Sequence, residues 1–352
     1  MKKNINMLLT GALIGILFFS FGNAQDNQKL GQAGFHFLSV TSDAKAAAMA
    51  DAVTSLQIGS SALFFNPSGM SDMDHFVDIA ASSNQWIADM KHYTIAAAIS
   101  PFHGDYGVLG ISFQYVDYGT LLMTVVDQSS NAGYQDIGTE KLYASAVGIG
   151  YAKKLTDRFS VGAQVRMAWQ DLGTSVIPNE NTSIPIYTDS THNTISGYKD
   201  SASTISNKLH PLVFDFGTQF KTGFKSLVFG MSVRNFSGDM QYAYEVFQLP
   251  LVFTLGISMN LMDLIGTVPL DQEFYLSVDA SHYRDQPEQL KIGADYRIMK
   301  LLALRAGYNT NTDEAGFSFG MGIYQAGFAF DYSYTPYGIF DKVQRMTARF
   351  SF

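Results

Sequence analysis

Two stretches near the end of the chain, Ala326–Tyr334 (AGFAFDYSY) and Gln344–Phe352 (QRMTARFSF), decide its fold. In both, apolar or aromatic residues alternate with small, polar or charged ones, and a period of two places these sets on opposite faces of a β-strand. A soluble sandwich would bury the apolar face, whereas a membrane barrel would turn it toward lipid and its polar face toward the lumen. The two stretches alone are compatible with either fold.

The composition restricts the possible functions. Only 15% of the 352 residues are charged, whereas about a quarter is usual in a soluble domain. The net charge of −8 argues against nucleic acid as a partner, because the chain has no basic field to attract phosphates. Cysteine is absent, which excludes disulfides, thiolate catalysis and cysteine-ligated zinc.

The N-terminus predicts export. Lys2 and Lys3 precede an apolar run over Met7–Phe21, and small residues follow up to Ala24. This is the pattern of a secretory signal peptide over residues 1–24, with cleavage after Ala24. No later apolar run reaches the roughly 18 residues that a transmembrane helix needs. Insertion into a membrane would therefore require a β-barrel.

Residues 25–73 differ from the rest of the chain. The alanine-rich stretch Thr41–Ser55 predicts a short helix that Ser42 or Asp43 could cap. The segment is too small to fold alone, so we expect it to pack in the mouth of a barrel as a hatch, or plug. It ends in a turn signal made of four residues, Asn66, Pro67, Ser68 and Gly69.

From residue 74 to residue 352 the chain shows period-two alternation in about fourteen segments of the length of barrel strands. Long connectors, such as Asp117–Glu140, Asp171–His210 and Ser237–Gln248, alternate with short ones, such as Met299–Lys300. Long outer loops alternating with short periplasmic turns are typical of outer-membrane barrels. The sequence therefore predicts an all-β fold, a transmembrane antiparallel β-barrel of about 14 strands with a short N-terminal helical hatch. The expected strands are His75–Ser82, Lys91–Ser100, Tyr106–Val116, Lys141–Ala152, Phe159–Gln170, Leu209–Phe220, Ser226–Phe236, Leu249–Met259, Asp271–His282, Gln289–Ile298, Leu301–Tyr308, Ala315–Ile323, Ala326–Tyr334 and Gln344–Phe352.

The phase of these strands predicts which residues face lipid and which face the lumen. Apolar residues such as Val165, Met167 and Trp169 share one face and should point outward. Mixed charges on the other face suit a wet or plugged lumen, where water and opposite charges can satisfy them. The expected inward residues are Gln164, Arg166, Asp215, Arg234, Glu273, Asp279, Lys291, Asp295, Arg297, Arg305, Asp331, Arg345 and Arg349.

The sequence does not predict an enzyme. The seven histidines are scattered and form no His-x-x-x-His pair for zinc. Gly320-Met321-Gly322 lacks the third glycine and the helix of a dinucleotide site. We therefore expect no catalytic, cofactor-binding or metal-binding residues.

Two hatch motifs carry a family resemblance. Residues 42–52 (SDAKAAAMADA) and 61–69 (SALFFNPSG), together with Leu304–Tyr308 (LRAGY), resemble the PorV/PorQ family of the FadL-like outer-membrane group. Ser68 stands where relatives have alanine, and Ala50-Asp51 where they commonly have Gly-Gly or Gly-Asp, so the subfamily stays open. The signal peptide ending is of a kind common in Bacteroidota.

The resemblance implies a fourteen-stranded barrel in the outer membrane and a role in type IX secretion. Its partners would be the type IX translocon and secreted cargo proteins, besides the outer-membrane lipid. A FadL-type passive channel for hydrophobic small molecules is the alternative, and a purely structural barrel is a third. A small, charged lumen favours protein binding over transport. An outer hydrophobic pocket could still come from three loop residues, Leu121, Leu122 and Met123.

The last strand has a separate expected role. Gln344–Phe352 should pair with His75–Ser82 to close the sheet, because closure removes the two exposed edges. Phe352, at the end of the chain, resembles the C-terminal aromatic residue by which the barrel assembly machinery recognises its substrates.

Overall fold

The computed structural model describes residues 32–126, 131–187, 195–242, 245–265, 271–312, 316–340 and 342–352, without the side chains of residues 103, 126 and 176–204. The predicted signal peptide, residues 1–24, lies outside this part of the chain. Within the described residues, no helix combines the length and the apolar composition needed to cross a membrane.

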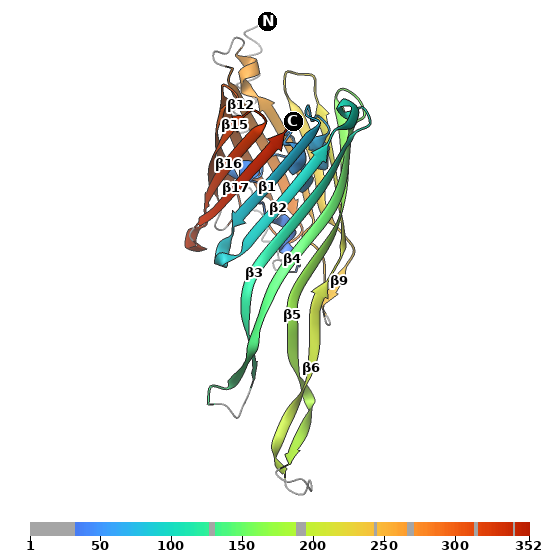
Figure 1. The fold of residues 1–352 in the computed structure, drawn as a ribbon, viewed down its shortest axis with the longest axis vertical. Helices are drawn as coiled ribbons and strands as arrows, with labels where there is room; N and C mark the ends of the chain where they lie inside the picture. Colours follow the sequence, from blue (N-terminus) through green and yellow to red (C-terminus); the bar gives the residue numbers. More distant parts are fainter. Residues whose placement is uncertain are drawn as a thin grey trace.

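The described residues form a closed antiparallel barrel of fourteen strands, so the predicted fold class is confirmed (Figure 1). Short turns and the C-terminus lie at one end, which we call the inner end. Long hairpins project from the opposite, outer end (Figure 1). The barrel strands are β1 (Val77–Gln85), β2 (Lys91–Ile99), β3 (Val108–Val126), β4 (Tyr134–Lys154), β5 (Phe159–Tyr187), β7 (Leu212–Lys221), β8 (Val228–Phe236), β11 (Val252–Asn260), β12 (Glu273–Tyr283), β13 (Gln289–Ile298), β14 (Leu302–Asn309), β15 (Phe317–Gln325), β16 (Phe328–Pro336) and β17 (Lys342–Ser351).

Short helices and three further strands complete the fold. Strand β6 pairs with the outer part of β5, while β9 and β10 form a small hairpin between β8 and β11. These elements are β6 (Ile195–Leu209), β9 (Met240–Tyr242), β10 (Glu245–Phe247), α2 (Ala44–Ala48), and the 3₁₀ turns η1 (His36–Ser39), η2 (Gly59–Phe64), η3 (Pro67–Met70), η4 (Ile87–Asp89), η5 (Pro101–Gly104), η6 (Leu261–Leu264) and η7 (Gly338–Phe340).

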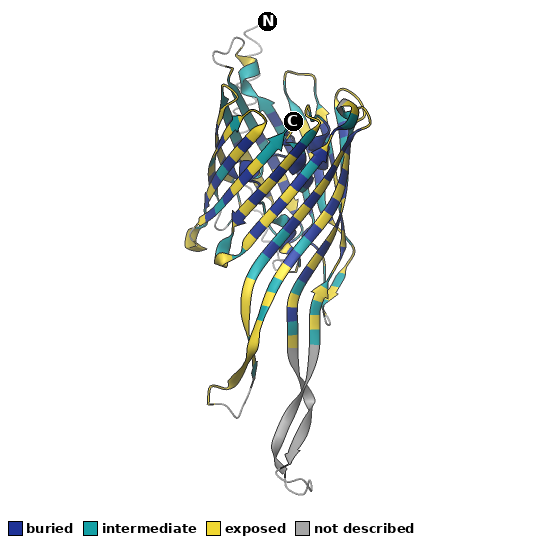
Figure 2. Cartoon of the chain, in the orientation of Figure 1, coloured by how far each residue is buried: buried dark blue, intermediate teal, exposed yellow. Residues whose placement is uncertain are grey.

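The last strand closes the sheet as predicted. β17 pairs antiparallel with β1, from Asp78 opposite Ser351 to Gln85 opposite Gln344. Phe330 and Met346 are exposed on the barrel exterior, whereas Asp331 and Thr347 are buried on the luminal face. This alternation of exposed and buried residues runs around the whole wall (Figure 2). An exterior of exposed large apolar residues is the surface that lipid requires.

The three long connectors are not the loops that the sequence predicted. Strands β3 and β4 continue as a hairpin to Val126 and Tyr134, and β5 continues with β6. The third connector contains the β9–β10 hairpin. The strand phase shifts at a bulge after Asp117 and again after Asp171, so the period-two pattern is interrupted there. In each bulge the aspartate side chain accepts a hydrogen bond from the amide of the glycine two residues later.

The hatch, which we define as residues 32–73, lies inside the barrel (Figure 1). Its α-helix covers only Ala44–Ala48, so the expected helix over Thr41–Ser55 is too long. Asp43 is the N-cap, and its Oδ1 accepts from the Ala46 amide at 2.9 Å. The helix ends because Ala50 and Asp51 both take positive φ, at 52° and 65°, which turns the chain along the wall.

Glycines on the luminal face let the hatch backbone approach the wall. A Cβ atom at Gly293 would lie 2.7 Å from the Met49 carbonyl oxygen. A Cβ at Gly230 would lie 2.9 Å from the Ser55 Cα. Both contacts are shorter than any side chain tolerates, so these strands need residues without a side chain where the hatch touches them.

The predicted hatch turn anchors this packing. Asn66 caps η3 through its Oδ1, which accepts from the Ser68 amide at 3.1 Å. Its Nδ2 donates to the Thr54 carbonyl at 2.7 Å and to the Thr218 carbonyl at 3.1 Å. Thr218 lies on β7, so one buried side chain joins two parts of the hatch to the barrel wall.

The exterior face yields a depth-dependent prediction. Met321 lies at the midpoint of β15 and is 51% exposed, whereas Phe317 lies at the outer end of the same strand and is 57% exposed. Met321→Arg should cost about 2–4 kcal/mol of unfolding free energy, and Phe317→Arg only about 0–1 kcal/mol, because a charge costs most at the bilayer midplane. Urea unfolding in phospholipid vesicles measures both. Equal costs would contradict the membrane placement.

The hatch turn yields a second prediction. Asn66→Ala should lower the unfolding free energy by about 2–3 kcal/mol, because the Thr218 carbonyl and other buried groups lose their partner. Asn311→Ala is the matched control, since Nδ2 of Asn311 donates to a backbone carbonyl at an exposed turn. Limited proteolysis should then cut the hatch of the Asn66 variant faster than that of the control. A wild-type cleavage rate for Asn66→Ala would show that the turn does not anchor the hatch.

Candidate functional site

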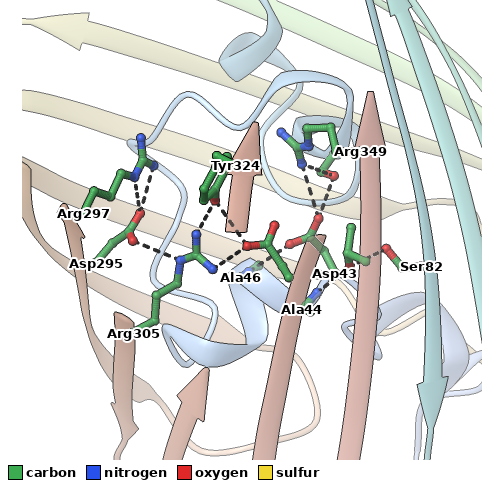
Figure 3. Close-up of polar contacts among 12 residues, drawn as sticks. Asp43, Ala44, Ala46, Ser82, Asp295, Arg297, Arg305, Tyr324 and Arg349 are labelled. Carbon is green, nitrogen blue, oxygen red and sulfur yellow. Dashed lines mark hydrogen bonds and ion pairs between the residues drawn. The ribbon is translucent and has the colours of Figure 1, made fainter. Parts of the chain in front are cut away.

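Buried polar contacts join the luminal faces of strands β13 to β16 (Figure 3). Asp295 accepts from Arg297 at 2.9 Å and from Arg305 at 3.0 Å. Arg305 also donates to Asp331 at 2.6 Å and to the hydroxyl of Tyr324. The side chains of Arg305 and Asp295 are buried, so each charge is neutralised by its partners rather than by water.

A second set of contacts joins the hatch to β17 (Figure 3). Arg349 donates to the Ile58 carbonyl at 2.6 Å and to Ser61 Oγ at 2.7 Å, and it lies 3.5 Å from Asp43. The Ala44 amide donates to Thr347 Oγ1 at 2.8 Å. The hatch is therefore held by polar groups that are themselves buried, and breaking one contact would leave an unpaired partner.

The inner end of the hatch carries a half-buried ion-pair clamp. Asp72 lies 2.5 Å from the ammonium group of Lys154 on β4 and also contacts that of Lys221 on β7. Burial alone would raise the pKa of the Asp72 carboxyl, but hydrogen bonds from the two lysines hold that pKa below its usual range. The clamp therefore stays ionised at neutral pH.

These contacts fill the lumen with protein. An apolar cluster of hatch residues, including Met49, Leu63 and Met70, packs against Ala96 and Val108 of the wall. All the residues that the sequence placed inward are buried or half-buried, as expected. Most of the buried charges among them hold the hatch or each other, so the plugged lumen is the correct alternative.

A large cavity opens at the outer end of the barrel, on the outer side of the hatch. It has a volume of about 1010 Å³. The start of the hatch contributes Phe35 and Phe37, the β1–β2 turn contributes Trp86, and the β9–β10 hairpin contributes Tyr242 and Phe247. Aromatic side chains from three separate segments thus face one space, which we call the outer cavity.

Stacked rings hold the outer cavity together. The ring centroids of Phe35 and Phe247 lie 6.5 Å apart, and those of Phe247 and Tyr242 lie 5.2 Å apart. Phe35 takes a φ of 57°, which is uncommon for a bulky residue. The Gly34 amide donates to the Gln248 carbonyl at 3.1 Å, so backbone pairing ties the start of the hatch to the end of this hairpin.

About half of the residues that line the outer cavity carry polar side chains, and some of these are paired. His36 lies 3.5 Å from Asp285, and Gln248 donates to Asp239 at 2.6 Å. Burial raises the pKa of Tyr242 to about 12, so its phenol is neutral at physiological pH. The Tyr242 hydroxyl is buried without a hydrogen-bond partner among the described residues.

The predicted site residues lie elsewhere. Leu121, Leu122 and Met123 lie on the outer hairpin of β3, where both leucines are 56% exposed, and they do not line the outer cavity. Binding by them stays a prediction, as does an assembly role for Phe352. The Phe352 amide and carbonyl both bond to Val77 of β1, and its ring lies 5.5 Å from that of Phe350.

Sequence reasoning missed the aromatic residues of the outer cavity. A signal was present in Phe35 and Phe37, because two phenylalanines in a hatch cannot be explained by contact with lipid. Trp86 and Phe247 lay outside the predicted strands and gave no comparable signal. Among the described residues, no group of three or more histidine, aspartate or glutamate side chains could hold a metal ion.

Comparisons with known proteins identify the architecture. No protein-family model matches the chain, and no curated protein matches it. Among solved structures, it resembles the CymD monoaromatic hydrocarbon channel with a TM-score of 0.58 and 12% sequence identity, over 89% of this chain and 98% of that one. The toluene transporters TbuX of Ralstonia pickettii and TodX of P. putida each give a TM-score of 0.55 at 13% identity, over 88% of this chain and 98% of theirs.

At such low identities the likeness concerns the fold alone. It covers 98% of each channel and 88–89% of this chain. Nothing in it points to the PorV/PorQ family specifically. The chain therefore has the architecture of the FadL-like outer-membrane barrels.

Proposed function

We propose that this chain is a non-enzymatic outer-membrane barrel that takes up small hydrophobic molecules, with the outer cavity as its first binding site. The aromatic lining of that cavity is the observation that carries the proposal. Concave sites lined by aromatic side chains, with a few polar groups, are the usual form of a small-molecule site. The structural neighbours described as hydrocarbon channels and toluene transporters support the same class of ligand.

Each part of the outer cavity would have a distinct role. Phe247 and Trp86 would bury the apolar surface of the ligand, which is the main source of affinity. Charged side chains, among them Glu245 and Arg284, also line the cavity and could contact a polar group on the ligand.

Passage from the cavity to the inner end of the barrel requires the hatch to move, because hatch residues fill the lumen between them. At the start of the hatch, backbone pairing with Gln248 holds Ala33 and Gly34, and apolar packing against the wall holds Phe35 and Phe37. The contacts of Arg349 are buried and mutually dependent, and breaking such a set costs about 3–5 kcal/mol. A small ligand would therefore rearrange the start of the hatch before its middle.

Type IX secretion is the second candidate. It rests on the resemblance of the hatch motifs to the PorV/PorQ family and on the exposed Leu121 and Leu122 of the outer hairpin, which could contact a partner protein. The structural neighbours favour the channel over this role. Deleting the gene tests it, because cargo with a type IX C-terminal domain should then accumulate unprocessed in the periplasm. Normal processing of that cargo would exclude the role.

A pair of arginine substitutions tests the cavity. Phe247→Arg should weaken binding of naphthalene to the purified barrel at least about tenfold, because it places a charge in the apolar site. Leu121→Arg, on the hairpin outside the cavity, should leave binding unchanged. Fluorescence titration of naphthalene measures both. Loss of binding in the Leu121 variant alone would show that the site lies on the hairpin. Absence of binding by the wild type would reject the proposal.

A further inference from the structure

The barrel exterior has a depression across β7, β8, β11 and β12. Its volume is about 370 Å³. One row of outward residues, Thr218, Met231, Leu255 and Ala280, pairs side by side across the four strands. A second row, two residues nearer the inner end on β7 and β8, consists of Phe220, Phe229, Ile257 and Val278. We call the space between these rows the wall groove.

The wall groove belongs to the lipid-facing surface. Phe229 and Leu255 are exposed on it, and it is continuous with the apolar exterior of the barrel. The glycines at positions 230 and 256 contribute backbone to its lining. An empty depression at hydrocarbon depth would lose dispersion contacts on one side, so an apolar chain of the surrounding lipid is the natural occupant.

Two cations lie at the inner end of the same strands. Lys225 lies in the β7–β8 turn and Arg158 in the β4–β5 turn, and both are exposed. A backbone hydrogen bond of 2.7 Å, from the Lys221 amide to the Arg158 carbonyl, joins the two turns. A Cβ at Gly223 would lie 2.9 Å from the Arg158 Cζ, so the guanidinium lies against the β7–β8 turn.

These cations differ from Lys154 and Lys221, which have an acid partner. Asp72 binds both Lys154 and Lys221 at this end of the barrel. Within the described residues, neither Arg158 nor Lys225 forms an ion pair. Phe220 directly precedes Lys221, whose amide bonds to Arg158, so the two turns begin where the apolar wall groove ends. Apolar groove and unpaired cations together match a ligand with an acyl chain and an anionic headgroup.

We propose that the wall groove and the Arg158–Lys225 turn pair form a binding site for one glycerophospholipid. An acyl chain lies in the groove, and the phosphate contacts the guanidinium and the ammonium group, which are the usual donors to phosphate. The orientation predicted from the signal peptide places this headgroup on the periplasmic side. The site is separate from the outer cavity and does not depend on the uptake proposal.

The test measures lipid retained by the barrel. Purified protein is reconstituted into vesicles of equal parts palmitoyl-oleoyl phosphatidylethanolamine and phosphatidylglycerol, re-extracted in dodecyl maltoside, and analysed by native mass spectrometry. The wild type should retain one phospholipid molecule per barrel. Ala280→Phe, which fills the groove, should lose most of it, and Thr218→Leu serves the same purpose if the first variant does not assemble. Ala348→Phe, at an outward position of β17, should retain the wild-type amount.

Charge variants test the headgroup contact. The double variant Arg158→Gln with Lys225→Gln should retain several-fold less lipid, whereas Lys300→Gln, at the β13–β14 turn and paired with Asp271, should not change retention. The proposal is overturned if the wild type keeps no phospholipid, if it carries a protein there instead, or if groove-filling and control variants behave alike. An unchanged charge variant would reject the phosphate contact.

Discussion

Closure of the sheet is the constraint on which this structure depends. In hydrocarbon, an unpaired backbone amide or carbonyl cannot be satisfied by water, so the first and last strands have to pair. β17 meets β1 over eight residue pairs, from Asp78–Ser351 to Gln85–Gln344. Every outward side chain then faces lipid and every inward one faces a confined lumen. The hatch, the buried charges and the outer cavity all follow from filling that lumen.

The lumen is filled by two complementary means. Glycines of the wall, such as Gly293, let the hatch backbone approach, while arginines such as Arg349 reach hatch carbonyl groups. Buried ion pairs contribute little net stability compared with apolar packing, but they penalise any arrangement that separates them. They therefore specify one position for the hatch more than they strengthen the barrel. A hatch placed in this way leaves empty space mainly at the outer end.

The middle and the start of the hatch are held by different kinds of contact. Its middle is fastened by Asn66 and Arg349 through several buried hydrogen bonds. Its start is held by apolar packing of Phe35 and Phe37 against the wall and by backbone pairing with Gln248. The aromatic outer cavity lies there.

The sequence by itself determined the strands, their two faces, the closing pair and the existence of a hatch, because alternation and turn signals are local properties of the chain. It placed Asp331 and Phe330 on the correct faces. Only the tertiary structure decided how far β3 and β5 extend, since bulges after Asp117 and Asp171 interrupt the phase on which the prediction depends. The tertiary structure also decided where the outer cavity forms and which residues line it. Phe35, Trp86 and Phe247 are far apart in the sequence and meet only because the closed barrel confines the hatch beneath them.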